Sequence, residues 1–333
     1  MPMILSADIG GTKTLVELCQ IDQSQHQSIK KEKFVSAKFS QFEAILKKFL
    51  SDSPPIDAAC FAIAGPVNST KNYQTAKVTN LPWQLNSHAI GQNFKIGNVT
   101  FINDFQAMGY AIEHLSNTDI DVLQTGTPQP HGVRAVIGAG TGLGEAILVY
   151  QNANYEVLPS EGGHQDFAVN STLELELYEY LAKQYAHVSY ERILSGQGLL
   201  NIFRFLLNKT ENINAAQSHQ QIMESEDPAA SISSAAISQQ SPLAVQALSL
   251  FMKIYGAQAG NLALTCLPTA GIYVTGGIAS KNLAFLKNSE FLISFNNKGR
   301  MQNLLESIPV SIVTNTDAGL IGARAFAKKM VKQ

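Results

Sequence analysis

The segment AVIGAGTGLGEAILVY, residues 135–150, decides how the chain folds around its middle. Strand-like residues at Val133–Ile137 and Ala146–Tyr150 flank the glycine-rich turn Gly138–Gly144. Glycines in such a turn let backbone amides approach a phosphate group, because no Cβ stands in the way. The segment therefore predicts a β-hairpin whose glycine turn, with Thr141 at its centre, can bind a polyphosphate; a plain turn is the alternative.

Two common nucleotide-binding motifs do not fit this turn. A dinucleotide fingerprint needs a third glycine followed by a helix, but Leu143 occupies that position and a strand follows. A Walker A loop needs Gly-Lys-Ser/Thr, which the sequence lacks. The remaining interpretation is a glycine-rich turn between two strands of a β-hairpin.

A second glycine turn, DIGGTK at residues 8–13, opens the chain between the β-like runs Ile4–Ile9 and Thr14–Ile21. Its backbone amides and the Thr12 hydroxyl suit a phosphate, and Asp8 can hold Mg²⁺ directly or through water. An ordinary hairpin turn is the alternative. The candidate contacts are Asp8, Gly10, Gly11 and Thr12. Two halves that open alike suggest a duplication, with two similar lobes facing a cleft.

Strands alternate with helices along the rest of the chain, so the predicted class is α/β. Ser40 with Glu43, and Ser171 with Glu174, resemble capping boxes that open helices. Ala58–Ala64 is expected as a buried strand, and Leu199–Leu207 as a helix. Asn208–Ser241, rich in Ser, Gln, Ala and Asn, is expected to be a surface segment with marginal helices.

Asn103-Asp104 stands between an apolar strand, Val99–Ile102, and an apolar helix-like stretch, Phe105–Leu115. A carboxylate near a helix N-terminus is favoured in its charged form, in which it can accept a proton from an alcohol. Ligands of α/β folds also collect at strand carboxyl ends. A simple helix cap is the alternative.

A polar cluster, EGGH at residues 161–164, brings Glu161 and His164 together around two glycines. These side chains can hold hydroxyl groups, as can Glu191. Metal binding is disfavoured, because no cysteine lies near and no second histidine stands at ligand spacing. Gly276-Gly277 follows the strand-like Gly271–Thr275, where an adenine ring could lie against the backbone.

The composition excludes several classes of protein. The chain has 333 residues, 45% hydrophobic and 15% charged, and its net charge of −2 comes without a basic block. We therefore expect neither a nucleic-acid nor a membrane partner. No apolar run reaches about 18 residues, and no signal peptide is visible. Cys19, Cys60 and Cys266 are expected as buried thiols in a cytoplasmic protein.

Taken together, the motifs resemble those of the bacterial glucokinases in the hexokinase/actin-like ATPase superfamily. The resemblance covers about residues 4 to 325. The motifs that carry it, in chain order, are DIGGT (8–12), AGP (64–66), NLPW (80–83), IND (102–104), GAGTGLG (138–144), EGGH (161–164), ERILSG (191–196) and TGGI (275–278).

The resemblance implies a role for each candidate residue. Asp104 matches the general base. It would accept the proton of the glucose 6-hydroxyl as the oxygen of that hydroxyl attacks the γ-phosphate of ATP. The implied sugar ligands are Asn103, Asp104, Glu161, His164 and Glu191. The implied nucleotide contacts are the two glycine turns and the adenosine region Gly276-Gly277, with Asp8 placing Mg²⁺.

The resemblance also implies an architecture: a two-lobed actin-like ATPase (ribonuclease H-like) α/β fold, with the active-site cleft between a small and a large domain. The expected ranges are 1–112 with 315–333 for the small domain and 113–314 for the large one. The family further suggests a homodimer.

Two departures lie beside the expected sugar site. Ser160 stands where a glycine is frequent in the family, and Gln197 replaces a common proline. Another hexose, such as mannose, fructose or an amino sugar, therefore stays open as substrate. Polyphosphate or ADP also stays open as phosphoryl donor.

Two other classes use the same fold. A non-catalytic sugar sensor would want an N-terminal DNA-binding helix pair, but only three residues precede the first expected strand. An actin-like scaffold ATPase would not need the Glu161–His164 and Glu191 cluster. The zinc-bearing repressor/ORF/kinase pattern is also absent, since no cysteine lies between Cys60 and Cys266.

Overall fold

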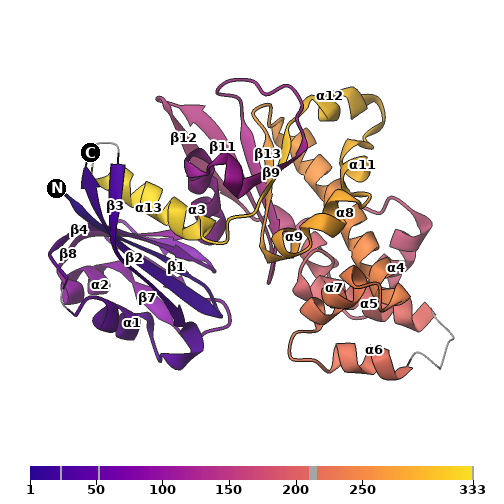
Figure 1. Cartoon of the computed structure of the whole chain (residues 1–333), viewed down its shortest axis with the longest axis horizontal. Helices are drawn as coiled ribbons and strands as arrows, with labels where there is room; N and C mark the ends of the chain where they lie inside the picture. Colours follow the sequence, from indigo (N-terminus) through magenta and orange to yellow (C-terminus); the bar gives the residue numbers. More distant parts are fainter. Residues whose placement is uncertain (23–24, 52, 210–215, 332–333) are drawn as a thin grey trace. The chain divides into compact units, whose positions relative to one another are not determined.

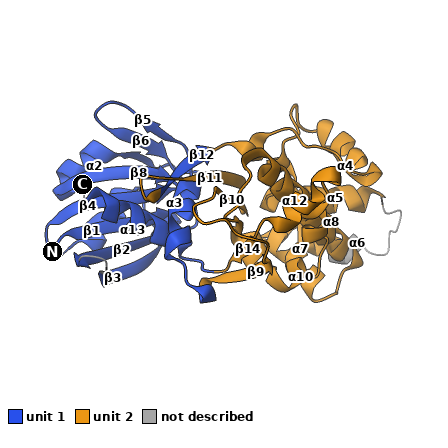
Figure 2. Cartoon of the chain, turned by 90° about the horizontal axis from the view of Figure 1, so that it is seen from above, with its two compact units in different colours: residues 1–118, 155–159, 315–333 blue, residues 119–154, 160–314 orange. Residues whose placement is uncertain are grey.

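The computed structural model describes residues 1–22, 25–51, 53–209 and 216–331. The chain divides into two compact units (Figure 2). Unit 1 comprises residues 1–118, 155–159 and 315–333, and unit 2 comprises residues 119–154 and 160–314. The ranges expected from the sequence are 1–112 with 315–333, and 113–314. In the described residues, no helix is long and apolar enough to cross a membrane.

Unit 1 contains a five-stranded sheet with the order β3-β2-β1-β4-β8. β1 pairs antiparallel with β2 and parallel with β4, and β4 pairs parallel with β8. The predicted hairpin around DIGGTK is confirmed. The strands are β1 (Met3–Ile9), β2 (Lys13–Asp22), β3 (Gln25–Val35), β4 (Ile56–Ile63) and β8 (Ile96–Asn103), with a small separate sheet of β5 (Val67–Ser69), β6 (Gln74–Lys77) and β7 (Gln84–Asn86).

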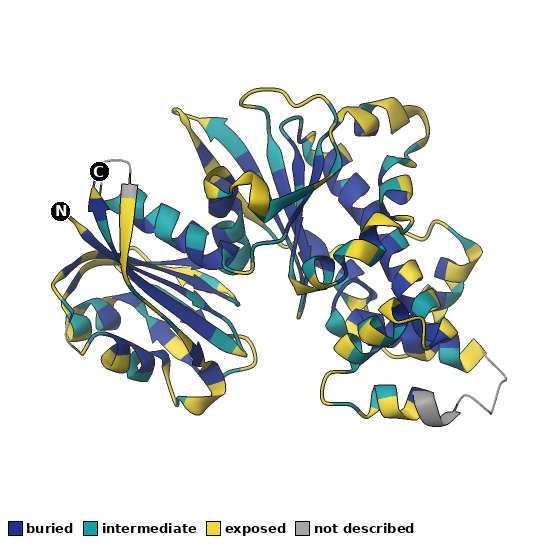
Figure 3. Ribbon diagram, viewed as in Figure 1, coloured by how far each residue is buried: buried dark blue, intermediate teal, exposed yellow. Residues whose placement is uncertain are grey.

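The core of unit 1 forms where α1 (Phe42–Phe49) buries its apolar face against the sheet. Phe42, Ile45, Leu46 and Phe49 are fully buried in one cluster with strand residues, and Figure 3 shows the central strands as buried. The capping box predicted at Ser40 is wrong. The cap position is Gln41, in extended conformation and with no side-chain cap bond, so the helix begins one residue later.

The other helical segments of unit 1 include the C-terminal α13, which packs against α3, β1 and β4 (Figure 1). Glycine at Gly322 permits this packing, because a Cβ there would overlap the carbonyl oxygen of Ala107 in α3. The segments are η1 (Ser36–Lys38), α2 (Ser87–Phe94), α3 (Asp104–Ala111), η2 (Ile112–His114), η3 (Asn117–Asp119, whose last residue belongs to unit 2) and α13 (Ala318–Met330).

Unit 2 is built on a second sheet with the order β12-β11-β10-β13-β14-β9. β10 pairs antiparallel with β11, and β10, β13 and β14 are parallel, so the second predicted glycine hairpin is also confirmed. The strands are β9 (Ile120–Gln124), β10 (Arg134–Ala139), β11 (Leu143–Gln151), β12 (Asn154–Ser160, of which residues 155–159 belong to unit 1), β13 (Ile272–Thr275) and β14 (Val310–Val313).

The long helix α8 (Pro242–Cys266) is central to the core of unit 2. The helices α5, α7 and α11 pack on it, and Figure 1 shows α5, α7 and α8 together. The other helical segments are η4 (Gly162–His164), α4 (Thr172–Ala182), η5 (Tyr190–Arg192), α5 (Gly196–Lys209), α6 (Ala216–Met223), α7 (Pro228–Ile237), α9 (Gly277–Lys281), α10 (Leu283–Lys287), α11 (Phe291–Asn296), η7 (Gly299–Met301) and α12 (Gln302–Ser307).

Three sequence expectations concern these helices. Leu199–Leu207 lies within α5, as predicted, and the Ser171 side chain caps α4 by accepting from the Glu174 amide. The segment Asn208–Ser241 includes residues 210–215, which lie outside the described residues. Beyond them it forms α6 and α7, and α7 buries Ile232 and Ala236 completely.

Candidate functional site

The first glycine turn closes directly after β1. The Gly10 amide donates to the Lys13 carbonyl (3.0 Å), and the Ser36 hydroxyl donates to the Gly10 carbonyl (2.8 Å). Gly11 packs against the backbone at Thr79, since a Cβ on Gly11 would lie 2.9 Å from the Thr79 carbonyl oxygen. The turn is therefore held on both sides, and the Thr12 side chain is exposed.

Asn103 and Asp104 form the junction between β8 and α3. Asn103 is the cap of α3, because its side-chain oxygen accepts from the Phe105 amide (2.8 Å) while Gln106 accepts from the Asn103 amide (3.1 Å). The alternative role considered for Asp104, that of a helix cap, is therefore filled by Asn103. Asp104 is the first residue of the helix, and its carboxylate also accepts from the Phe105 amide (3.0 Å).

The carboxyl groups of Asp104 and Asp8 both resist ionisation. Burial, with the negative charge of Asp8, raises the pKa of Asp104 to about 7, although bonds from the Phe105 amide and the Asn103 side chain act in the opposite direction. Burial also raises the pKa of Asp8 to about 6; Lys13 lowers it and Asp317 raises it. A site with two such acids gathers negative charge that a cation or a proton would relieve.

The residues around Asp8 fit a magnesium ion that arrives with a nucleotide. Magnesium takes only one or two protein carboxylates and completes its shell with water and phosphate oxygens. Asp8 and Asp317 supply negative charge, and a Cβ on Gly319 would lie 2.9 Å from a carboxylate oxygen of Asp8. No group of three or more ligating side chains that could hold a metal occurs in the described residues.

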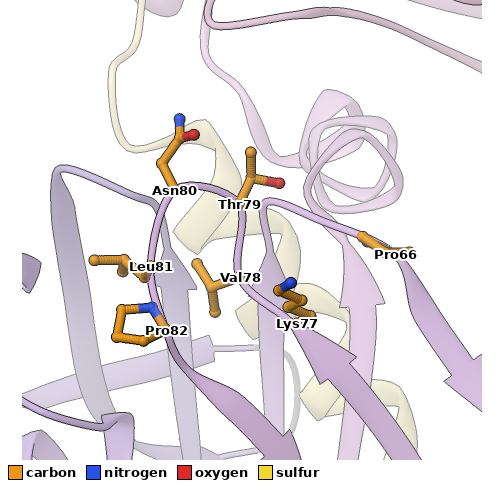
Figure 4. Close-up of a pocket in the computed structure, with 7 residues that line it drawn as sticks. All are labelled: Pro66, Lys77, Val78, Thr79, Asn80, Leu81 and Pro82. Atoms are coloured by element: carbon orange, nitrogen blue, oxygen red, sulfur yellow. The ribbon is translucent and has the colours of Figure 1, made fainter.

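A pocket of about 450 Å³ lies beside the first glycine turn, lined by the turn that follows β6 (Figure 4). Thr79 and Asn80 stand at the tip of that turn, and Asn80 has a left-handed backbone with φ 63°. The single tryptophan, Trp83, is a core anchor: it is buried, and its ring N–H donates to the Phe39 carbonyl (3.2 Å).

In unit 2 the second glycine turn contacts a candidate sugar ligand. The Gly140 amide donates to the Gly142 carbonyl (2.8 Å), and the Gly196 amide donates to the Gly140 carbonyl (2.8 Å). The carboxylate of Glu191 accepts from the Leu143 amide (3.0 Å), and a Cβ on Gly142 would overlap that carboxylate. Unit 2 thus brings Glu191 to the turn, whereas nothing within 4 Å would meet a Cβ on Gly140.

Glu161 directly precedes the short helix η4, and His164 is the last residue of that helix. Their side chains face solvent, with 87% and 60% exposed, and the His164 ring nitrogen lies 3.9 Å from the Glu161 carboxylate. The two glycines between them are buried. A Cβ on Gly163 would overlap the Leu143 carbonyl, so the segment lies directly on the second glycine turn.

Gly276 and Gly277 form the junction between β13 and α9. Gly276 has φ 89° and passes so close to the Ala139 carbonyl that a Cβ would overlap it. Gly277 is exposed, with no atom within 4 Å of a Cβ position. The junction therefore presents open backbone next to the end of β10.

Sequence reasoning missed three groups. Asp317 precedes α13 and acts on Asp8 through its charge. Gly65 accepts from the Asn103 side-chain amide at 3.4 Å, and Glu145 is buried beneath Gly162. Asp317 and Glu145 lie outside the sequence motifs, and Gly65 lies in the motif AGP without having been predicted as a site residue.

Comparison with known proteins gives one consistent result. A family model described as Glucokinase matches residues 5–330. The glucokinase of Nostoc punctiforme is 44% identical over 345 residues, covering 99% of this chain and 100% of that protein. The described motifs thus lie in a match that spans nearly the whole chain.

Solved structures agree. The crystal structure of a glucokinase from an Antarctic psychrotroph has a TM-score of 0.82 and 30% identity, with 99% of each chain covered. A ROK family glucokinase from Streptomyces griseus, in complex with glucose and AMPPNP, has a TM-score of 0.65 and 22% identity, covering 98% of this chain and 99% of that one. The second likeness concerns the mixed α/β fold alone.

Proposed function

This chain belongs to the glucokinase family, and on that premise we propose that it transfers the γ-phosphate of ATP to the 6-hydroxyl of glucose. The product is glucose 6-phosphate, the first intermediate of glucose use in glycolysis. The extent of the match, from residue 5 to residue 330, supports the family's reaction for the whole chain.

Asp104 carries the chemical part of the proposal as the general base. Its pKa of about 7 suits proton transfer near neutral pH, because a base is most effective when its pKa lies close to the working pH. It accepts the proton of the attacking hydroxyl. Phosphoryl transfer otherwise depends mainly on positioning and on neutralising charge.

The proposed sugar ligands are Asn103, Glu161, His164 and Glu191. Asn103 can offer its amide nitrogen, since its side-chain oxygen is used in the helix cap. Glu161, His164 and Glu191 hold ring hydroxyls. Charged and polar partners of this kind discriminate between sugars, because a missing hydroxyl leaves a polar group unpaired.

The nucleotide meets three backbone segments. Gly10, Gly11 and Thr12, together with Gly140, Thr141 and Gly142, bind the phosphates through amides and hydroxyls. Gly276 and Gly277 receive the adenosine. Asp8 would hold Mg²⁺ through water, and the ion would neutralise phosphate charge; the neighbouring charge of Asp317 supports a place for a cation there.

We further propose the architecture of the hexokinase/actin-like superfamily, with the active-site cleft between a small domain (1–112 with 315–333) and a large one (113–314). The family suggests a homodimer, which a light-scattering mass of the purified protein tests directly. The free cysteines Cys19, Cys60 and Cys266 suit a cytoplasmic enzyme.

The experiment that tests the reaction replaces Asp104 with Asn. Glucose phosphorylation should fall by orders of magnitude, about 10²-fold or more, while glucose binding measured by calorimetry largely survives. Turnover near that of the native protein would show that Asp104 is not the base.

The substrate is tested with a sugar panel. We expect glucose to give the highest kcat/KM with ATP and Mg²⁺, ahead of mannose, fructose and glucosamine. Ser160 is the reason to test several sugars. Its hydroxyl accepts from the Gly162 amide (3.0 Å) beside the proposed sugar ligand Glu161, at a position where the family frequently has glycine. A higher value for another hexose would replace glucose in the proposal, and sugar binding without turnover would favour a sensor.

A further inference from the structure

A buried acid lies directly behind the segment that carries Glu161 and His164. Glu145, in β11, is 2% exposed, and a Cβ on Gly162 would overlap its carboxylate. Only a glycine lets the backbone at residue 162 come this close. The position of η4 is therefore tied to the position of the Glu145 side chain.

Glu145 is the end of a hydrogen-bonded chain of buried side chains. Gln258, in α8 and 1% exposed, donates to the Glu145 carboxylate (2.9 Å) and accepts from the Asn261 amide (3.2 Å). The Asn261 amide also donates to the Tyr190 hydroxyl (2.9 Å). Lys298 donates to the Asn261 side-chain oxygen (2.6 Å) and so fixes the orientation of that amide.

The chain ends beside the second sugar-ligand segment. Tyr190 is buried and directly precedes Glu191, and its amide donates to the Gln165 carbonyl (3.0 Å), one residue beyond His164. Three side-chain hydrogen bonds therefore link the backbone around Glu161–His164 to the backbone around Glu191. Both ends belong to unit 2.

Stability alone does not account for an acid at this place. Burial raises the pKa of Glu145, the bond from Gln258 lowers it, and no cation among the described residues contributes. Burying a carboxyl group carries a desolvation cost that an apolar side chain of similar volume would avoid. A buried carboxyl group at this position therefore suggests a function that depends on its directional hydrogen bond with Gln258.

We propose that Glu145 is a positioning residue: through the network Glu145–Gln258–Asn261–Tyr190 it sets the spacing between the sugar ligands Glu161, His164 and Glu191. The inference rests on the proposed function, because it assumes that these three side chains bind the sugar. Glu145 itself touches no substrate. Its loss changes glucose affinity because the ligands move relative to one another.

The test compares Glu145→Ala and Glu145→Gln with a matched control, Glu174→Gln. Glu174 is also 2% exposed in unit 2, but it accepts from the Asn170 amide at the start of α4 and makes no hydrogen bond to the network, although its charge helps to raise the pKa of Tyr190. For each protein, kcat, the KM for glucose at saturating ATP, the KM for ATP at saturating glucose and the Tm are measured.

Glu145→Ala should raise the KM for glucose by about tenfold or more, the effect of losing one buried hydrogen bond, and change the KM for ATP less than twofold. Glu145→Gln keeps the volume and a bond to Gln258, so it should recover much of the glucose affinity. Glu174→Gln should lower Tm with the KM for glucose unchanged.

A second pair of variants tests the contact itself. Gly162→Ala places a methyl group where the Glu145 carboxylate lies and should raise the KM for glucose. Glu145→Ala removes that carboxylate, so the double variant should be less impaired than the product of the two single effects. Multiplicative effects would show that the two positions act separately and would overturn the inference.

Two other results would also overturn it: an unchanged KM for glucose in Glu145→Ala, or equal changes in both KM values. These outcomes presuppose a native protein that phosphorylates glucose. Failure of the native protein to do so defeats the proposed function first, and the two failures are therefore distinguishable.

Discussion

At the scale of single residues, two acids share one environment. Asp8 is the penultimate residue of β1 and Asp104 is the first residue of α3, and the negative charge of Asp8 contributes to the high pKa of Asp104. A cation near Asp8 would relieve the same mutual repulsion. The pH dependence of the reaction rate should therefore depend directly on the ionisation of these two carboxyl groups.

The first prediction concerns the pH dependence of the reaction. Asp104 accepts a proton only when ionised, so kcat/KM for glucose should rise with pH through about 7 and level off above it. Asp8→Asn removes a charge that raises this pKa, so the inflection should move to lower pH even as the rate falls. An inflection that stays in place in Asp8→Asn would contradict the coupling.

The second prediction concerns stability. Because the pKa of Asp104 is raised on folding from 3.8 to about 7, the folded state binds its proton more tightly. The resulting stabilisation is complete below the unfolded-state pKa and is lost as pH rises through about 7. Asp104→Asn should thus gain about 1–3 kcal/mol in unfolding free energy at pH 8.

That gain should shrink towards zero as pH falls below the unfolded-state pKa of 3.8, because the Asp104 carboxyl is then mostly protonated in both the folded and the unfolded protein. Urea unfolding at about pH 3, 6 and 8 measures it. A variant less stable than the native protein at pH 8 would mean that the charged carboxylate is stabilised by its neighbours.

The third prediction separates two glycines of the same turn. A Cβ at Gly142 would overlap the Glu191 carboxylate, whereas a Cβ at Gly140 meets nothing. Gly142→Ala should therefore raise the KM for glucose by about tenfold by displacing Glu191. Gly140→Ala should affect the KM for ATP and spare that for glucose. If Gly142→Ala changed only the KM for ATP and Gly140→Ala only the KM for glucose, Glu191 would not be a sugar ligand.

At the scale of elements, close packing of α13 on α3 depends on Gly322. Gly322→Ala forces a methyl group into the Ala107 carbonyl and should cost about 1–3 kcal/mol in unfolding free energy. Gly91→Ala, in α2, is the control: its Cβ would meet the Ile96 carbonyl at 3.4 Å, an ordinary contact. There the better helix propensity of alanine should make the change neutral or stabilising.

The elements that the sequence predicted well have strong local signals. The glycine hairpins, the apolar strand Ala58–Ala64 and the cap at Ser171 carry their pattern in a few adjacent residues. β3 was not predicted, because QHQSIKKEKFV is largely polar and lacks the apolar run that marks the other strands. Pairing with β2 forms this strand, and its lysines suit an edge exposed to water.

The candidate site shows the same division. Asp8, Asn103 and Asp104 stood out because each borders a glycine or a strand end. Glu145 and Asp317 did not, because their importance arises from residues distant in sequence: Gln258 and Gly162 for the first, Asp8 for the second. A sequence motif indicates which residues contact a ligand. The residues that hold the motif in place are distant in sequence, so the motif does not reveal them.

At the scale of the whole molecule, unit 1 is assembled from both ends of the chain. Residues 315–333 supply α13, which packs against α3, β1 and β4. Deleting residues 315–333 should therefore expose the sheet of unit 1 and abolish activity. In hydrogen exchange, amides of β1 and β4 should lose protection, while those of α8 and β10 keep it. Retained protection in β1 would show that the sheet stands without α13.

The same discontinuity bears on how the protein is made. A ribosome releases β1 long before α13, with about 200 residues between the end of the first segment of unit 1 and the helix, or roughly 10–40 s of synthesis at common elongation rates. Throughout that interval the nascent sheet lacks its covering helix. The organism must either shield this surface with a chaperone or tolerate its exposure until α13 has been made.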